Sequence, residues 1–190
     1  MNWKCEIFSH LILALFNVYT VLCTMIVLGV DIGSQNFAVA VVSVGFGCYE
    51  LIESTTYKIC KPRQVNLIRT QRKISKIIMK YMDEYKVEIT AIEKQPWTFS
   101  KNSSLSYITA LNIAIEAQLL SIISHYSCVA ISVNPKQVKL ITKISGIKTV
   151  NKYINKLDYY KTINVHVCNA QELDVHQFDA LFIAITCIIK

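Results

Sequence analysis

The stretch "MIVLGVDIGSQNFAVAVV", residues 25–42, decides how the fold is interpreted. An apolar run that is typical of a buried strand ends at Asp31, and a second apolar run follows a short turn that contains Gly33. We expect two strands joined by a tight turn, with a carboxylate at the end of the first strand. A carboxylate beside a buried run costs desolvation free energy unless it is paired or binds a cation. Asp31 is therefore a candidate site residue, although an aspartate that only caps or turns the chain would give the same pattern.

Length and composition favour one folded domain. The chain has 190 residues, of which 53% are hydrophobic, so it is long enough for an α/β core and too apolar to be disordered. Its formal net charge of +7 indicates a polyanionic partner, either nucleic acid or an acidic membrane surface. The seven cysteines show no CxxC pairing and lie mostly within apolar runs, which is typical of reduced core residues in a reducing compartment.

Basic residues are gathered in two blocks. Residues 58–80 contain eight basic side chains and no acidic one, and residues 136–161 contain seven lysines and one acid, Asp158. Blocks of this kind fit neutralisation of nucleic-acid phosphates. Two solvated helix faces would give the same pattern, so composition alone leaves both interpretations open.

The N-terminal segment is long and apolar, and 16 of the 20 residues 11–30 are hydrophobic. It could be a membrane anchor or signal segment, a core helix followed by a strand, or an extension upstream of the domain. We predict the third arrangement, with an apolar extension at 1–24 and one domain at 25–190, because the first strand uses the last part of the segment. Cys5 and Cys23 are candidate acylation sites that would bring the extension to a membrane.

The rest of the chain alternates strand patterns with helical ones. The predicted order is β-β-β-α-β-α-β-α with a terminal helix, on a sheet of mixed direction. The expected strands are 25–30, 37–44, 48–57, 87–94 and 127–133, and the expected helices include 65–85, 103–126 and about 171 to the end. The apolar face of the first helix is predicted to carry Leu67, Ile74, Ile77, Ile78, Tyr81, Met82 and Tyr85. Ser103 or Ser104 offers a cap for the second helix.

Three carboxylates and a histidine lie at the ends of predicted strands or on the last predicted helix. Asp31 ends the first strand, Glu93 ends the fourth, and His176 and Asp179 share a face of the last helix. If the two strands are neighbours and the helix crosses their ends, these side chains form a site for one or two magnesium ions. Two such ions about 4 Å apart can activate a water and stabilise the leaving oxygen in phosphodiester cleavage. Taken singly, Glu93 could be an exposed acid, Asp179 a partner of a lysine and His176 a surface histidine.

Four blocks of the sequence resemble those of the RuvC-type Holliday junction resolvases, which are ribonuclease H-like nucleases. They are "VLGVDIGSQNFAVAVV", "AIEKQPWTFSKNSS", "QVKLITKISG" and "HQFDALFIAI", and the "IEKQPW" form is most similar to the poxvirus branch. The resemblance runs from residue 25 to the end of the chain. It implies an α/β fold, namely a ribonuclease H-like mixed five-stranded sheet flanked by helices, with the apolar N-terminal extension before it.

The resemblance also implies which residues bind the metal. They are Asp31, Glu93, His176 and Asp179. Many members of the family have aspartate at the position of His176, so this histidine is either a metal ligand or the acid/base of the reaction. Asp174 is an alternative acid, but it lies five residues before Asp179 and shares a helix face with it poorly.

Further site residues follow from the same resemblance. A lysine near the scissile phosphate matches Lys139, where an ammonium would stabilise charge that develops on a phosphoryl oxygen. A second basic residue matches Lys148 or Lys152 less clearly. Trp97 and Phe99 could stack on an unpaired base at a junction, and core packing is the equally good alternative.

The resemblance implies a Mg²⁺-dependent endonuclease, in which Mn²⁺ can substitute, with two ions at each site. It would resolve four-way (Holliday) or cruciform DNA by paired symmetric cuts, and two equivalent cuts require a homodimer. The helix at 105–126 is a candidate interface, although burial in its own core is simpler. For a poxvirus-like member, the implied role is the resolution of viral DNA concatemers in the host cytoplasm or virion, with a membrane contact through residues 1–24.

Two other functions are weighed against this one. "DIGSQNFAVAVV" also resembles the first phosphate loop of the actin, sugar kinase and heat-shock chaperone superfamily, but the chain is about half the usual length and has five glycines in all. The apolar N-terminal segment and the basic blocks would also suit a membrane-associated scaffold protein. Hydrolysis of an RNA–DNA hybrid is a further option within the same chemistry.

Overall fold

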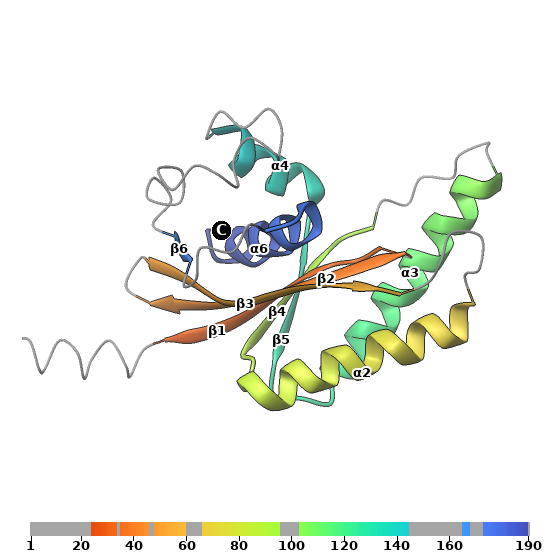
Figure 1. The fold of residues 1–190 in the computed structure, drawn as a ribbon, viewed down its shortest axis with the longest axis horizontal. Helices are drawn as coiled ribbons and strands as arrows, with labels where there is room; N and C mark the ends of the chain where they lie inside the picture. The colour runs from red at the N-terminus through yellow and green to blue at the C-terminus, as the bar shows by residue number, and fades with distance from the viewer. Residues whose placement is uncertain are drawn as a thin grey trace, which may run out of the picture.

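The computed structural model describes residues 24–33, 35–45, 48–59, 66–95, 103–144, 165–167 and 173–189. These residues form one mixed sheet with helices on both of its faces (Figure 1). The strands are β1 Met25–Asp31, β2 Asn36–Gly45, β3 Cys48–Lys58, β4 Ile89–Glu93, β5 Val129–Val133 and β6 Val165–Val167. The helices are α2 Leu67–Tyr85, α3 Ser103–Ile123, α4 Pro135–Ile144 and α6 Val175–Ile188.

The strand order in the sheet is β5-β4-β1-β2-β3-β6. β1 and β2 pair antiparallel, as do β2 and β3, whereas β4 is parallel to both β1 and β5. This topology confirms the predicted ribonuclease H-like α/β class. The difference from the prediction is the sixth strand, β6, whose three residues pair in parallel with β3 at one edge of the sheet.

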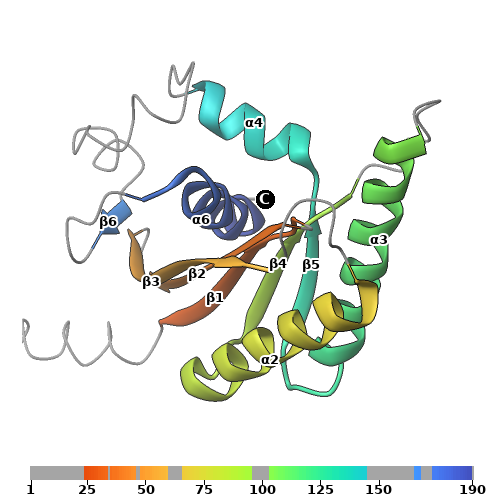
Figure 2. The same ribbon diagram turned by 45° about the vertical axis from the view of Figure 1, so that its right-hand side comes forward.

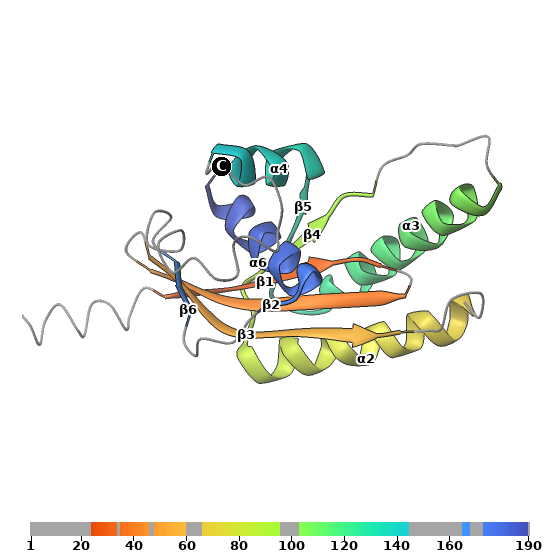
Figure 3. The same cartoon turned by 45° about the horizontal axis from the view of Figure 1, so that its top comes forward.

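The helices form a layer on each face of the sheet. Helices α2 and α3 cover one face, and α4 and α6 cover the other (Figures 2 and 3). Each layer has its own core: α6 packs on one set of strand side chains, and α2 and α3 pack on the alternate set. The central strands are therefore buried on both faces, which explains why their sequences are nearly continuous apolar runs.

The two faces of the sheet differ in the size of their side chains. On β2, Ala38 and Ala40 face α6, whereas Phe37 and Val39 face α2 and α3. Gly29 on β1 extends the small-residue surface, since a Cβ atom there would lie 2.0 Å from the carbonyl oxygen of Ala180. The small residues let α6 approach the sheet closely.

Helix α2 begins and ends at residues suited to these positions. The side chain of Asn66 caps its start and accepts a hydrogen bond of 3.0 Å from the amide of Arg69. Lys86, in the left-handed conformation with φ of 50°, ends it. The predicted apolar face is buried except at Leu67, which is 39% exposed, and at Tyr85, which is half-buried. That part of the prediction is wrong because Leu67 lies in the first turn of the helix, at the margin of the core.

The predicted boundaries differ by a few residues elsewhere. The last helix starts at Val175 rather than near 171, because Asp174 caps it and forms a capping box with Gln177. Side chains at the start of α3, which include the predicted serine cap, lie outside the described residues. Residues 1–23 of the predicted extension also lie outside them.

Two further expectations concern membranes and cysteines. Among the described residues, no helix combines the length and the apolar character needed to cross a bilayer. Of the cysteines in the described ranges, Cys187 is buried, Cys128 is half-buried and Cys48 is exposed, all as free thiols. The expectation of a core position is therefore wrong for Cys48, which is the first residue of β3.

Candidate active site

Two predicted acids lie at the same end of two neighbouring strands. β1 and β4 are parallel, and their register pairs Val30 with Ile92, so the residues that follow, Asp31 and Glu93, end their strands side by side. Because both strands are central in the sheet, their backbones hold the two carboxylates at fixed positions. The structure thus confirms the predicted proximity of these strand ends.

Helix α6 brings the other two predicted residues to the ends of β1 and β4. It packs across β1 and β2, and its core residues Phe178, Leu181 and Phe182 fix the helix on that face. His176 and Asp179 lie in its first turns, directly after the capped start at Asp174. The close approach at Gly29 places these side chains next to the end of β1.

The imidazole of His176 is hydrogen-bonded through both nitrogens. Nδ1 lies 2.9 Å from Oδ2 of Asp31, and Nε2 lies 3.1 Å from the side-chain nitrogen of Asn36. Asp31 is 9% exposed, so its carboxylate is buried beside this histidine. His176 is thus a partner of Asp31, while its side chain is still 38% exposed.

The carboxylates influence one another electrostatically. Burial raises the pKa of Glu93 to about 7, and the negative charges of Asp31 and Asp179 add to this rise. The pKa of Asp179 is raised to about 6, first by burial and then by the charge of Asp31. Burial also raises the pKa of Asp31, against the hydrogen bond and charge of His176. The charge of Asp31 thus raises the pKa of both Glu93 and Asp179, and that of Asp179 raises the pKa of Glu93, so the three acids form one electrostatic cluster.

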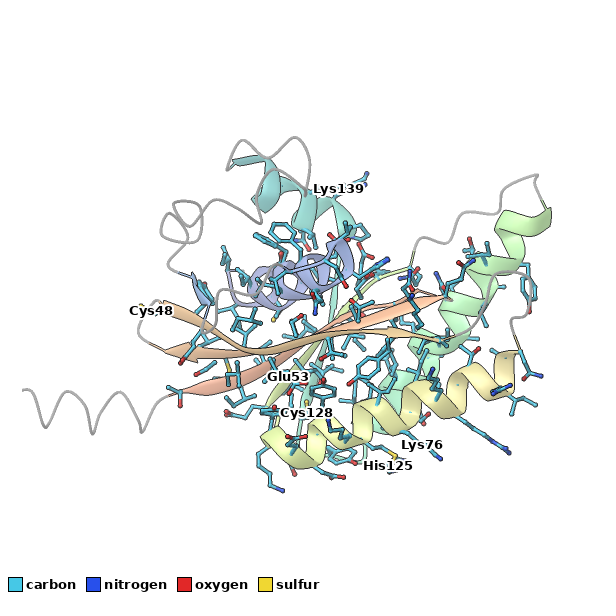
Figure 4. All side chains as sticks on the ribbon, in the orientation of Figure 1. Cys48, Glu53, Lys76, His125, Cys128 and Lys139 are labelled. Atoms are coloured by element: carbon cyan, nitrogen blue, oxygen red, sulfur yellow. The ribbon has the colours of Figure 1, made fainter. Side chains whose placement is uncertain are left out.

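Lys139 approaches the same cluster from helix α4. It lies on the side of the sheet that α6 covers, and Figure 4 labels it on α4. Its positive charge lowers the pKa values of both Glu93 and Asp179. The lysine chosen from the "QVK" block is therefore within electrostatic range of the acids, although its side chain is exposed.

The cluster is not yet a formed metal site. Within the part of the chain that the structure describes, no three His, Cys, Asp or Glu side chains are arranged so that they could hold an ion as they stand. The metal-binding roles of Asp31, Glu93, His176 and Asp179 therefore stay predictions. Asp174, the alternative acid, has other partners: its carboxylate caps α6 and accepts a 2.9 Å hydrogen bond from Thr56.

Two polar groups at the site were missed in the sequence. Asn36 supplies the second partner of His176, and only the pairing of β2 with β1 reveals it. Gln95 is 7% exposed; its side chain donates to the carbonyl oxygen of Glu93 and accepts from Asn112 on α3. Its backbone amide also donates to Glu116 on the same helix. These contacts hold the segment that follows Glu93 against α3.

Several other predicted residues cannot be compared with the structure. Trp97, Phe99, Lys148 and Lys152 lie outside the described residues. Their suggested roles remain predictions.

Comparisons with known proteins bear on the fold of this site. No protein-family model and no curated protein matches the chain. Among solved structures, T. thermophilus RuvC in complex with a Holliday junction substrate superposes with a TM-score of 0.62 at 20% identity, covering 85% of this chain and 91% of that chain. The yeast mitochondrial Holliday junction resolvase Ydc2 gives a TM-score of 0.61 at 11% identity, covering 86% and 78%. The chain has the fold of the RuvC-type resolvases.

The similarity to the poxvirus branch of this fold is weaker. The fowlpox virus resolvase in complex with Holliday junction DNA gives a TM-score of 0.44 at 17% identity, covering 85% of this chain and 92% of that chain. The poxvirus assignment therefore stays a prediction. Since all these identities are low, the likeness to RuvC-type structures establishes the fold, while activity is a separate question.

Proposed function

We propose that this chain is a metal-dependent endonuclease that cuts DNA at four-way junctions. The observation that carries the proposal is the cluster of Asp31, Glu93 and Asp179, which a RuvC-type fold holds at the ends of two adjacent parallel strands and one helix. Acids gathered at one edge of a sheet, with a lysine nearby, suit hydrolysis of a phosphodiester better than they suit packing.

The donor atoms of the cluster fit a hard divalent cation. Carboxylate oxygens are the ligands that Mg²⁺ and Mn²⁺ prefer, and His176 adds a nitrogen that favours Mn²⁺. The charge of Asp31 raises the pKa values of Glu93 and Asp179, and the charge of Asp179 raises that of Glu93, so negative charge gathers here that a dication would neutralise. When bound, Mg²⁺ would polarise the scissile phosphate and lower the pKa of an attacking water.

The chain's own residues have distinct tasks in this reaction. Asp31, Glu93 and Asp179 would hold the cations, and His176 would orient the Asp31 carboxylate through the 2.9 Å contact. Lys139 would face the phosphate and stabilise the negative charge that develops on its oxygen. His176 is either a further cation ligand or the group that moves a proton.

Paired cuts in a junction require two copies of the site, so we propose a homodimer. Helix α3 supports this proposal because Tyr107 and Ile108 near its start are 54% and 39% exposed. Residues of α3 that face the sheet, such as Leu111 and Ile115, are buried in the chain's own core. Two-fold symmetry would present two equivalent sites to the two equivalent strands.

The proposed setting is a viral one. Resolution of replicating DNA concatemers in the host cytoplasm, or in the virion, follows from the sequence resemblance to the poxvirus branch. Residues 1–24 would add a membrane contact to this enzyme without taking part in the chemistry.

The test is cleavage of a labelled four-way junction by the full-length chain in the presence of Mg²⁺. We expect paired nicks at symmetric positions in opposite strands, and a loss of at least a hundred-fold in rate for Asp31→Asn or Glu93→Gln. Glu84→Gln makes the same chemical change on the exposed end of α2 and should keep the wild-type rate. Undiminished nicking by Asp31→Asn, or no nicking by the wild type, would overturn the proposal.

The choice of substrate is tested in the same assay. A junction, a linear duplex of equal length and an RNA–DNA hybrid are compared at equal concentration. Preference for the hybrid would keep the hydrolytic chemistry and reject the junction assignment.

A further inference from the structure

The outward face of α2 carries a row of five cations, which we call the α2 stripe. Its members are Arg69, Arg72, Lys73, Lys76 and Lys80. All five are exposed, while the opposite face of the helix is buried against the sheet at positions such as Ile74 and Ile78. The spacing of three and four residues places the cations along one side of the helix.

The arrangement of charge on α2 works against the helix itself. The cations start in its first turns, near the positive end of the helix dipole, and the acids Asp83 and Glu84 lie in its last turn, near the negative end. Neighbours in the stripe, such as Arg72 and Lys76, are like charges four residues apart, which repel one another. Lys80 pairs with Glu84 at 3.7 Å, but among the described residues no acid pairs with Arg69, Arg72 or Lys76. A helix that needed only solubility would distribute these charges differently.

The α2 stripe begins near the ends of β1 and β4, where the candidate active site also lies. Lys58, at the end of β3, pairs with Asn36, whose side chain contacts His176. The ammonium of Lys73 donates a 2.5 Å hydrogen bond to the carbonyl oxygen of Lys58. From these strand ends the stripe runs along α2, on the face of the sheet that α4 does not cover. Lys76 and Lys139 therefore lie on opposite sides of the sheet (Figure 4).

Helix α2 is also fixed rigidly enough to present a defined row of charges. The carboxylate of Glu53 on β3 accepts hydrogen bonds from the hydroxyl groups of Tyr81 and Tyr85. Tyr81 is fully buried and also contacts the hydroxyl group of Tyr57. The stripe therefore belongs to the rigid part of the fold.

We propose that the α2 stripe binds the phosphate backbone of a DNA duplex arm that leaves the active site. Five cations over 11 residue steps extend about 16 Å along the helix, and over that length of duplex axis one DNA strand carries about five phosphates. The linear spacing matches a backbone better than it matches a single phosphate group. This inference rests on the proposed function for the identity of the polyanion, and it adds a contact surface away from the acids.

The test measures binding rather than cleavage. The full-length chain is titrated with a four-way junction with long arms, without divalent cations, over a range of KCl concentrations. Joint replacement of Arg72→Gln, Lys73→Gln and Lys76→Gln should make the slope of log K against log salt shallower by about 2 to 3. It should also weaken binding at least tenfold at moderate salt. Circular dichroism establishes that the variant is folded, and Lys73→Arg with Lys76→Arg should retain the wild-type slope.

A matched pair of single changes separates position from total charge. Lys76→Gln removes one charge from the stripe, and Lys86→Asn removes one charge just beyond the helix, where asparagine suits the left-handed backbone. We expect a shallower slope for Lys76→Gln only. Equal slopes for the two variants, or an unchanged slope for the triple variant, would overturn the inference.

The competing ligand is an anionic membrane, because Ile68 and Met79 are exposed on the same helix. Binding of phosphatidylserine vesicles that depends on the stripe, together with DNA binding that does not, would also overturn it. If the triple variant loses DNA binding while no variant or wild type cuts a junction, the proposed function fails and the α2 contact stands.

Discussion

The ring of His176 joins the last helix to the first hairpin through two hydrogen bonds. Nδ1 lies 2.9 Å from Oδ2 of Asp31, and Nε2 lies 3.1 Å from the side-chain nitrogen of Asn36. When the Asn36 amide donates to Nε2, the proton of the neutral ring is on Nδ1 and is donated to Asp31. When the amide is turned over, its oxygen accepts from Nε2 and leaves the lone pair of Nδ1 available to a cation. In both arrangements Asn36 fixes the orientation of the ring.

Replacement of Asn36 should therefore lower cleavage without abolishing it. We expect Asn36→Ala to reduce the maximal rate about 10- to 100-fold, as is typical when a residue that orients a ligand is lost. Junction affinity should change little, because Asn36 is not part of a basic surface. Single-turnover rates and binding isotherms separate the two effects. Gln35→Ala, at the exposed position directly before β2, is the control; an equal loss in both variants would contradict the role of Asn36.

The contact of α6 with β1 depends on the absence of a side chain at Gly29. In Gly29→Ala the new Cβ would meet the carbonyl oxygen of Ala180 at 2.0 Å, and a backbone atom cannot move away as a side-chain end can. We expect a loss of about 1 to 3 kcal/mol in the free energy of unfolding, measured by urea denaturation. The cleavage rate should fall by more than the loss of folded protein explains, since His176 and Asp179 would move away from Asp31. Ser132→Ala, on an exposed position of β5, should leave both quantities unchanged.

The strands and the acids at their ends could be predicted, because the periodicity of apolar residues shows where each strand runs and where it stops. The run that ends at Asp31, the strand that ends at Glu93 and the alternation along β2 all depend on local sequence. Neighbouring parallel strands place their ends together, so the proximity of the two acids followed once the topology was assumed. The resemblance to resolvases supplied that topology.

The remaining features depend on contacts between distant segments. Asn36 and His176 are 140 positions apart, and neither local pattern indicates that an amide completes the histidine's hydrogen bonds. The contacts of the buried Gln95 could not be predicted for the same reason, because Asn112 and Glu116, two of its partners, lie on α3. Strand β6 has three residues, which is too short for a periodic pattern. The capping box at Asp174 was available in the sequence, and it would have placed the start of α6 correctly.

The raised pKa values predict how the stability of the cation-free protein depends on pH. Glu93, with a pKa of about 7, and Asp179, with a pKa of about 6, bind protons more tightly in the folded state than in the unfolded state. Their contribution to stability is therefore present below about pH 4.5 and is lost as the pH rises through 6 and 7. Because other groups titrate as well, the useful quantity is the difference between wild type and Glu93→Gln.

We expect Glu93→Gln to gain stability relative to wild type by about 1 to 2 kcal/mol between pH 5 and pH 8, after allowance for solvent screening. Urea denaturation in the presence of a chelator measures this difference. Glu84→Gln, which makes the same chemical change at an exposed position of α2, is the control. A constant difference for Glu93→Gln would show that the acid cluster does not raise its pKa.

A divalent cation should reverse this pH dependence, because it replaces the protons that the cluster binds. At pH 8, Mn²⁺ or Mg²⁺ at a hundred times its dissociation constant should stabilise the wild type by about 2.7 kcal/mol, seen as a higher unfolding temperature. Between pH 7 and pH 6 the apparent affinity should fall roughly fivefold, since Glu93 must lose a proton before it binds the ion. Asp31→Asn and Asp179→Asn should lose most of the gain, whereas Glu84→Gln should keep it. Equal stabilisation of Asp31→Asn and wild type would place the cation elsewhere and would remove the basis for assigning Asp31 as a ligand.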